Sequence, residues 1–227
     1  MRSQLLLALM AGVALAACAP APREVPIGPR APAGFPEQVY RQAVAAGQAV
    51  YRIDAASSIA VFEVHRGGAL ARIGHDHVVA SHEVQGYIEP AAKRADLYVP
   101  LSSLTIDEPK LRREAHFDTQ PSAEDIAGTG RNMRLRVLEV ARYPFARIAI
   151  RSAGNDYVDA DITLHGVTRA VHLPVRVAAG PNSLDVSGDF VIRQTDFGIA
   201  PLSVLGGAVR VEDAVPIRFT LHARRLQ

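Results

Sequence analysis

The chain has 227 residues, of which 48% are hydrophobic and 21% are charged, and its formal net charge is +2. That length fills one domain well and is too short for two full domains joined by a linker. Because the charges nearly balance and no basic block stands out, the composition excludes a protein that binds nucleic acid through its phosphate backbone.

The first residues have the pattern of a bacterial export signal. Arg2 supplies a positive charge, and residues 5–16 form an apolar run of twelve residues. As a helix this run spans about 18 Å, which is short of the ~30 Å that a membrane-spanning helix needs. We therefore predict a signal peptide over residues 1–17 and an exported protein.

The single cysteine of the chain, Cys18, ends this run. A lone cysteine excludes a disulfide framework and a thiolate metal cluster. The preceding Leu15-Ala16-Ala17 resembles a bacterial lipobox, which implies that Cys18 becomes the lipidated first residue of the mature chain and anchors it to a membrane. Ordinary cleavage after Ala16 would instead leave Cys18 as a free thiol. By resemblance to enteric lipoproteins, the presence of Ala19 rather than Asp favours the periplasmic face of the outer membrane over that of the inner one.

Residues 18–48 are expected to connect this anchor to the folded body. Six of the fifteen prolines fall between residues 19 and 37, and such a stretch favours extended polyproline geometry and builds no core. Residues 37–47 have the composition of a short helix that ends at Gly47. The folded domain itself is expected over residues 49–227.

In this body, apolar and polar residues alternate with a period of two, which is the pattern of antiparallel strands with one buried face. Ile162 and Leu164, for example, alternate with Asp161 and Thr163. Strands are therefore expected over residues 50–54, 58–66, 70–79, 83–89, 95–101, 157–164, 170–177, 184–193 and 215–222.

One region, residues 108–133, has a helical composition instead. Ser122 can cap a helix whose first turn contains Asp125. Gly128 and Gly130 argue against one long helix. We therefore expect one or two short helices that pack across an end of the sheet structure.

Strands without a parallel βαβ rhythm predict an all-β fold, a closed antiparallel β-barrel of about eight strands with a helical excursion. A barrel of this size either fills its interior with side chains or holds one small ligand. Aromatic residues make up only 6% of the chain and tryptophan is absent, so few bulky side chains are available as fillers, although leucine and isoleucine can also fill the middle. The residues expected to line the interior are Phe62, Val64, Val99, Ile162, Leu164, Leu173, Phe190, Ile192 and Phe219.

Several segments resemble the YceI-like family, bacterial periplasmic proteins with a lipocalin-like β-barrel that bind polyisoprenoids. The most specific are the Leu-His-Gly-Val-Thr turn at residues 164–168 and the Asp-Phe-Gly-Ile segment at residues 196–199. The segments at residues 51–54 and 96–104 also fit in order and spacing. The resemblance covers residues 50–224 and implies an antiparallel, lipocalin-like barrel.

The resemblance also implies a carrier or sequestering protein for a long apolar isoprenoid of the quinone or polyprenyl phosphate type. Two departures from the family pattern concern the ligand rather than the fold. Gly-His-Asp-His-Val-Val at residues 74–79 stands where many members have a Gly-Arg-Phe-like stretch, and residues 128–133 differ from the commoner segment. A headgroup at the barrel mouth needs hydrogen-bond donors, whereas the tail needs none. The candidates for contacting it are Arg72, His75, His77, Arg131 and Arg193.

His75 and His77 also allow a second interpretation, a zinc or copper site. Residues two apart in a strand place their side chains on one face, and two imidazoles are a workable pair of metal ligands. His82 and His116 can complete the set if the loop and the helical segment fold back. The isoprenoid interpretation requires no cofactor.

No motif indicates an enzyme. Ser102-Ser103 lacks the strand–turn–helix elbow of a catalytic serine, and no nucleophile lies beside Asp76 in the sequence. The chain has no phosphate loop, no dinucleotide fingerprint and no haem-attachment motif. We therefore expect a binding protein without catalytic residues.

Overall fold

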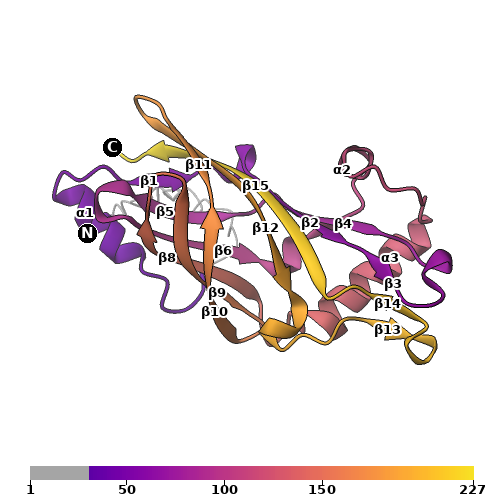
Figure 1. Cartoon of the computed structure of the whole chain (residues 1–227). Coiled ribbons are helices and arrows are strands. Elements are labelled where there is room, and N and C mark those ends of the chain that lie inside the picture. Colours follow the sequence, from indigo (N-terminus) through magenta and orange to yellow (C-terminus); the bar gives the residue numbers. More distant parts are fainter. Residues whose placement is uncertain (1–30) are drawn as a thin grey trace, which may run out of the picture. The chain divides into compact units, whose positions relative to one another are not determined.

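The described part of the chain, residues 31–227 of a computed structural model, is built mainly from antiparallel strands (Figure 1). The expected signal peptide over residues 1–17, the lipidation site Cys18 and residues 19–30 of the proline-rich stretch lie outside the described residues, so these remain predictions. No helix of the described part is long and apolar enough to cross a membrane.

The described residues contain three α-helices and fifteen strands. The helices are α1 (Glu37–Ala45), α2 (Pro109–Glu114) and α3 (Ala123–Asn132). The strands are β1 (Tyr51–Ile53), β2 (Ile59–Val64), β3 (Arg66–Gly67), β4 (His77–Ser81), β5 (Gln85–Glu89), β6 (Arg94–Pro100), β7 (Thr105–Ile106), β8 (Phe145–Ala153), β9 (Tyr157–Leu164), β10 (Val167–Pro174), β11 (Arg176–Ala179), β12 (Ser183–Arg193), β13 (Ser203–Val204), β14 (Val209–Val211) and β15 (Ala214–Arg225).

Twelve strands form one curved sheet. Its longest member, β15, is the last strand of the chain and pairs with both early and late strands. The backbone of β15 pairs with β12 over residues 214–224 and, on its other edge, with β1 and β2. The sheet continues from β1 through β5, β6, β8 and β9 to β10. A separate three-stranded sheet, in the order β13-β14-β3, lies at the same end of the molecule as α3 (Figure 1).

The sequence had led us to expect a closed barrel. The sheet curves into a cup, but within residues 31–227 no continuous ladder of backbone hydrogen bonds closes it. β10 pairs with β9, and β11 pairs with β12, so the chain itself bridges the gap at Val175. Among the described residues no backbone pairing joins β10 to β12. Pro174 has no N–H to donate, and the Val175 N–H bonds to the carbonyl oxygen of Asp156 instead. The expected all-β, antiparallel fold with few helices is therefore confirmed, but the sheet is a twelve-stranded cup with a seam and not a closed barrel of about eight strands.

Most expected strands are present, and the main exception is the one expected over residues 70–79. Residues 71–73 form a short 3-10 helix, and β4 begins only at His77. The strand expected over residues 58–66 is divided into β2 and β3 at His65. Both differences arise because the chain leaves the large sheet after β2, and β3 pairs with β14 instead.

The two helices of the excursion have different positions. The inner side of α2 packs on the outer wall of the sheet, where Leu111 contacts the cluster of Val61, Val78 and Ala80, rather than across an end. Helix α3 begins at Ser122, whose side chain and that of Asp125 form a reciprocal capping box.

Helix α3 continues through both glycines that were expected to interrupt it. Gly130 is buried, and a Cβ there would lie 3.1 Å from Cδ1 of Ile106 in β7. The glycine therefore permits a close approach of α3 to β7, and this packing outweighs the low helix propensity of glycine.

The short helix expected over residues 37–47 is present as α1, and it packs against the outer face of β5 and β6. The buried Tyr40 side chain stacks on Tyr87 with ring centroids 5.2 Å apart, and its hydroxyl donates a hydrogen bond of 2.6 Å to Asp96. Burial, together with this bond to a carboxylate, raises the pKa of Tyr40. Helix α1 therefore covers the outside of the wall and leaves the interior to the strands.

Replacing Phe197 by alanine is expected to lower the free energy of unfolding by about 3–5 kcal/mol. Phe197 is 2% exposed and belongs to a core cluster with Ile162 and Leu173, so its removal leaves a cavity in this cluster. Urea unfolding followed by circular dichroism measures the change. The control is Val191→Ala, because Val191 is 60% exposed and its truncation is expected to cost less than about 0.5 kcal/mol. Equal losses for the two variants would contradict the assigned core.

Candidate ligand-binding cavity

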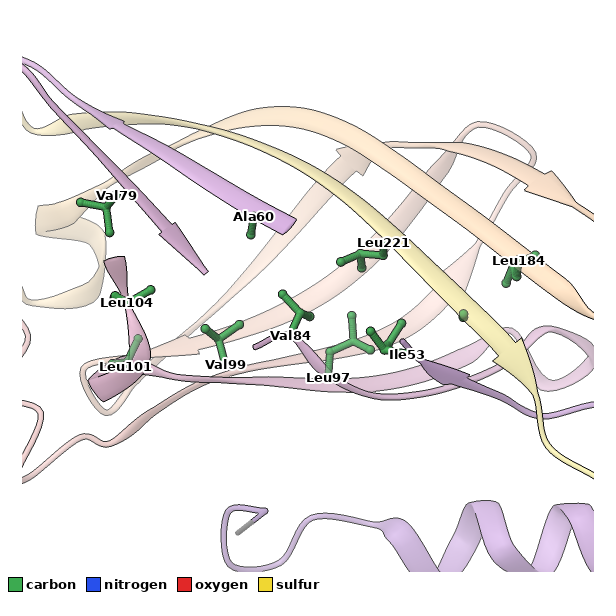
Figure 2. Packing of buried hydrophobic residues seen from close by; sticks show 11 residues of the cluster. Ile53, Ala60, Val79, Val84, Leu97, Val99, Leu101, Leu104, Leu184 and Leu221 are labelled. Atoms are coloured by element: carbon green, nitrogen blue, oxygen red, sulfur yellow. The ribbon is translucent and has the colours of Figure 1, made fainter. Parts of the chain in front are cut away.

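The inner face of the cup encloses a cavity of about 750 Å³. Its walls come from the inward alternation of the long strands, for example Leu97 and Val99 from β6 and Leu221 from β15 (Figure 2). These inward side chains are mostly valine, leucine, isoleucine and alanine, which are too short to meet in the middle. The size lies within the range of roughly 300–1,000 Å³ that is typical of small-molecule sites.

All nine residues that the alternation placed on the inner face line this cavity. They are Phe62, Val64, Val99, Ile162, Leu164, Leu173, Phe190, Ile192 and Phe219. That these side chains contact a ligand stays a prediction.

The cavity reaches both ends of the cup. At the end that carries α3, its lining includes Thr129, Asn132 and the exposed Val204. At the other end it includes Asn155 and Val177, of which Val177 is 51% exposed. The middle, in contrast, is lined by apolar side chains, so the site is a long apolar channel with polar groups at its ends.

The strongest polar feature of the lining is His77, which is held by a buried carboxylate. The imidazole Nδ1 lies 2.6 Å from Oδ2 of Asp107, a residue whose side chain is fully buried. The other carboxylate oxygen accepts hydrogen bonds from the backbone N–H of Val78 at 3.0 Å and from Arg112 at 2.6 Å. On the cavity side, Nε2 of His77 lies 3.3 Å from the Thr129 hydroxyl.

The hydrogen bonds of this cluster keep Asp107 ionised. Burial alone would raise the pKa of Asp107, but the hydrogen bonds from His77, the Val78 N–H and Arg112 outweigh it and lower the pKa. Asp107 is therefore a carboxylate at neutral pH, and its Oδ2 accepts a hydrogen bond from the Nδ1–H of His77. The orientation of the ring is thereby set, with Nε2 toward Thr129 and the cavity.

His75 lies beside His77 at the same end of the cavity. The two rings are 6.2 Å apart and nearly perpendicular, and both line the cavity, although His75 precedes β4 rather than lying in it. Nδ1 of His75 is buried without a hydrogen-bond partner among the described residues, and Nε2 is 3.7 Å from Asp125. An unpaired buried ring nitrogen favours a ligand group that can hydrogen-bond to it.

The other expected headgroup contacts are not part of the lining. Arg72, Arg131 and Arg193 are all exposed, and Arg193 lies 3.8 Å from Asp213. Arg72 is in the short 3-10 helix that replaces the expected strand, and Arg131 is in the last turn of α3. The arginines that do line the cavity are Arg66, Arg94 and Arg210, but the Arg94 guanidinium lies over the Tyr40 ring of α1, and those of Arg66 and Arg210 lie near Asp118 and Glu212.

The four histidines of the metal interpretation are not brought together. His82 follows the far end of β4 and lies 2.8 Å from Glu108, and His116 follows α2. In the described part of the chain, no group of three or more His, Cys, Asp or Glu side chains is placed to hold a metal ion. Asp76, which stands between His75 and His77 in sequence, instead accepts a 2.8 Å hydrogen bond from the Arg66 N–H.

A family model for the YceI-like domain matches residues 51–223. The chain belongs to the YceI-like family. A comparison with curated proteins finds no match to the chain.

Two solved structures show the same fold as this YceI-like chain. A polyisoprenoid-binding domain from Saccharophagus degradans, implicated in plant cell wall breakdown, aligns with a TM-score of 0.56 and 17% identity and covers 78% of this chain and 98% of its own. BcnA from Burkholderia cenocepacia aligns with a TM-score of 0.50 and 17% identity, over 75% of this chain and 98% of its own. At this identity the likeness concerns the fold, which is mainly β with an antiparallel sheet.

The two most specific family segments have structural roles. His165 and Gly166 form the two-residue turn between β9 and β10, with φ values of +51° and +77°, and the His165 ring packs on Tyr143 with centroids 4.4 Å apart. In the second segment, Phe197 and Ile199 are buried in the cluster that closes one part of the cup. Each segment also contributes one residue to the cavity lining, Leu164 and Ile199.

Replacing Asp107 by asparagine is expected to lower the free energy of unfolding by about 3–5 kcal/mol at pH 7, because it leaves buried Arg112 without its counter-ion. The native pKa of Asp107 is depressed below 3.8, so its contribution is complete above that value and is lost as the pH falls through the native pKa. The difference between wild type and variant should therefore shrink as the pH falls below about 3.8. Urea unfolding from pH 7 to pH 2.5 measures it.

The control for this experiment is Glu108→Gln. Glu108 is the next residue, its carboxylate is partly exposed, and it lies 2.8 Å from His82. Removing an ion pair of this kind is expected to cost less than about 1 kcal/mol. A loss for Asp107→Asn no larger than that of the control would show that the buried cluster contributes little.

Proposed function

We propose that this YceI-like protein binds a long apolar isoprenoid inside the cup, with the tail along the apolar channel and the headgroup at the end that carries α3. The observation that supports this most is a cavity of about 750 Å³ with apolar walls and polar groups at its ends. The Saccharophagus degradans protein that shares the fold is a polyisoprenoid-binding domain.

Burial of the tail supplies enough free energy for this function. Each isoprene unit has five carbons, and at about 0.8 kcal/mol per carbon one unit contributes roughly 4 kcal/mol before the entropic costs of binding. Three or four buried units can offset those costs and reach micromolar affinity, near −8 kcal/mol. The walls need only be apolar and open, which the inward valine, leucine and isoleucine side chains provide.

We assign the headgroup to His75 and His77. His77 is held rigidly by Asp107, and Nδ1 of His75 lacks a partner among the described residues. Both a quinone carbonyl and a phosphate oxygen accept hydrogen bonds from imidazole, so a headgroup of either type fits this pair. Arg66 and Arg210 also line this end, but each lies near a carboxylate of the protein, so the assignment of the headgroup rests on the two histidines.

The proposal describes a carrier or sequestering protein of the bacterial cell envelope and assigns no catalytic step. It includes export through the predicted signal peptide, anchoring through lipidated Cys18 and a position on the periplasmic face of a membrane, the outer one in preference. Protein partners and cofactors are not needed for it. The isoprenoid is the one ligand assigned.

Native mass spectrometry of the protein, exported to a bacterial periplasm and purified gently without chelators, tests the proposal directly. We expect an excess mass of several hundred daltons that is released as prenyl lipid on denaturation. An excess of tens of daltons that is lost in His75→Ala/His77→Ala would contradict it and indicate a metal ion. Repeated isolation as a bare chain, with no uptake of added isoprenoid quinone or polyprenyl phosphate, would also contradict it.

Replacing Ile148 by tryptophan is expected to lower isoprenoid affinity at least about tenfold, since the ring occupies volume that the tail would fill. Ile148 lines the cavity and packs against both core clusters, so the ring would lie midway along the channel. Binding is measured by titration with a fluorescent prenyl probe. The matched control is Val191→Trp, which adds the same ring to an exposed position outside the cavity. Equal affinity of the two variants would place the ligand elsewhere.

A further inference from the structure

The small sheet β13-β14-β3 carries exposed apolar side chains beside one mouth of the cavity. Ile73, Val204 and Leu205 are 58%, 45% and 65% exposed, and they lie on β13 and on the two short 3-10 segments packed beside the sheet. Val204 also lines the cavity, as does Gly74, the neighbour of Ile73. The apolar tips therefore surround one opening of the proposed ligand channel.

The segments of this sheet are joined to one another, so the tips form one surface. Val204 pairs with Val209, and Arg210 pairs with Gly67. The backbone N–H of Leu70 donates to the carbonyl oxygen of Ala208 at 2.8 Å. Figure 1 shows β13, β14 and β3 together at the end of the molecule that carries α3.

The backbone at the tip is unfavourable for the residue that it carries. Leu205 has a φ of +51°, in the left-handed region that favours glycine or asparagine. Gly206 and Gly207 follow it with φ values of +65° and +95°. An exposed leucine in this strained conformation does not contribute to the stability of the fold. Backbone strain of this kind is often found at functional sites.

The formal charges within these segments are all positive, and the carboxylates that balance two of them come from neighbouring residues. Residues 64–75 and 197–211 contain no aspartate or glutamate, and their arginines are Arg66, Arg72 and Arg210. Arg66 is paired with Asp76 and Asp118, and Arg210 lies 3.6 Å from Glu212.

Arg72, exposed beside Ile73, forms no ion pair among the described residues. Exposed apolar side chains can insert at the surface of a bilayer, and an unpaired arginine beside them adds attraction to anionic lipid.

We propose that the sheet β13-β14-β3, with Ile73, Val204 and Leu205 at its surface, docks on a bilayer that carries anionic phospholipid. Docking brings the mouth at Val204 to the membrane, so an isoprenoid can pass between bilayer and cavity without its tail crossing water. This inference rests on the proposed function, because docking on a bilayer aids ligand transfer only if the ligand resides in membranes.

The absence of tryptophan from the chain provides the test. In the full-length protein, single substitutions Leu205→Trp and, as a second probe of the same surface, Val204→Trp report the environment of the small sheet. Val177→Trp reports the opposite mouth, and Val191→Trp reports the exposed outer wall. Circular dichroism checks that each variant is folded, and the readout is local, so an acyl anchor common to all variants does not affect the comparison.

Each variant is mixed with vesicles of 70% phosphatidylcholine and 30% phosphatidylglycerol that contain no isoprenoid, with and without brominated acyl chains. We expect the emission of Leu205→Trp and Val204→Trp to shift to shorter wavelength and to be quenched by bromine, while Val177→Trp and Val191→Trp stay unchanged. Adding Arg72→Gln to Leu205→Trp should lower the ratio of docked to undocked protein about fivefold.

Three results would overturn the proposal. The first is no shift in either small-sheet variant, the second is equal quenching in the two control variants, and the third is a shift that appears with protein concentration alone, which would assign the surface to a second copy of the chain. Because the vesicles hold no isoprenoid, docking is read independently of ligand binding. Failure here together with bound prenyl lipid in the native mass spectrum would leave the proposed function standing.

Discussion

The interior of this protein depends on one constraint, that a curved sheet with short apolar side chains on its inner face cannot fill its own centre. β6, β8, β12 and β15 all turn valine, leucine, isoleucine or alanine inward, and Phe62, Phe190 and Phe219 are the only phenylalanines among the cavity-lining residues of the described part. The sheet keeps its curvature because β15 pairs with β12 on one edge and with β1 and β2 on the other. The space that remains is long and apolar, and a flexible hydrocarbon chain is the ligand class that fills such a space.

Polar chemistry is concentrated where α3 and β7 cover one end of this channel. Asp107 accepts hydrogen bonds from the Val78 N–H, Arg112 and His77, so a single buried carboxylate joins β4, α2 and the cavity wall. The cost of burying its charge is offset by these partners, and the arrangement leaves one face of His77 toward the ligand space. In the proposed function, the packing of the helices positions the group that recognises the headgroup, while the tail is bound without specific contacts.

The alternation of side chains was sufficient to predict the inner wall, because a strand with a period of two has only two faces. It could not predict the seam at Val175, since that depends on where β10 and β11 find different partners. It also missed Asp107, the partner of His77: the two are brought together by the pairing of β4 with β7, and the nearer carboxylate in sequence, Asp76, faces Arg66 instead. Arginines were the least predictable candidates, because a long side chain at a turn can point to either side. The local sequence around Arg72 and Arg193 is compatible with both orientations.

The central claim is that the channel between the two ends holds a prenyl chain. The most direct measurement is a crystal structure of the protein exported to the periplasm and purified without detergent or chelator. The account predicts continuous, elongated density along Val99, Ile148 and Phe219, with its polar end within hydrogen-bonding distance of His75 or His77. A channel closed by inward collapse of its walls, or a single compact peak between the two histidines with no density beyond it, would contradict the account.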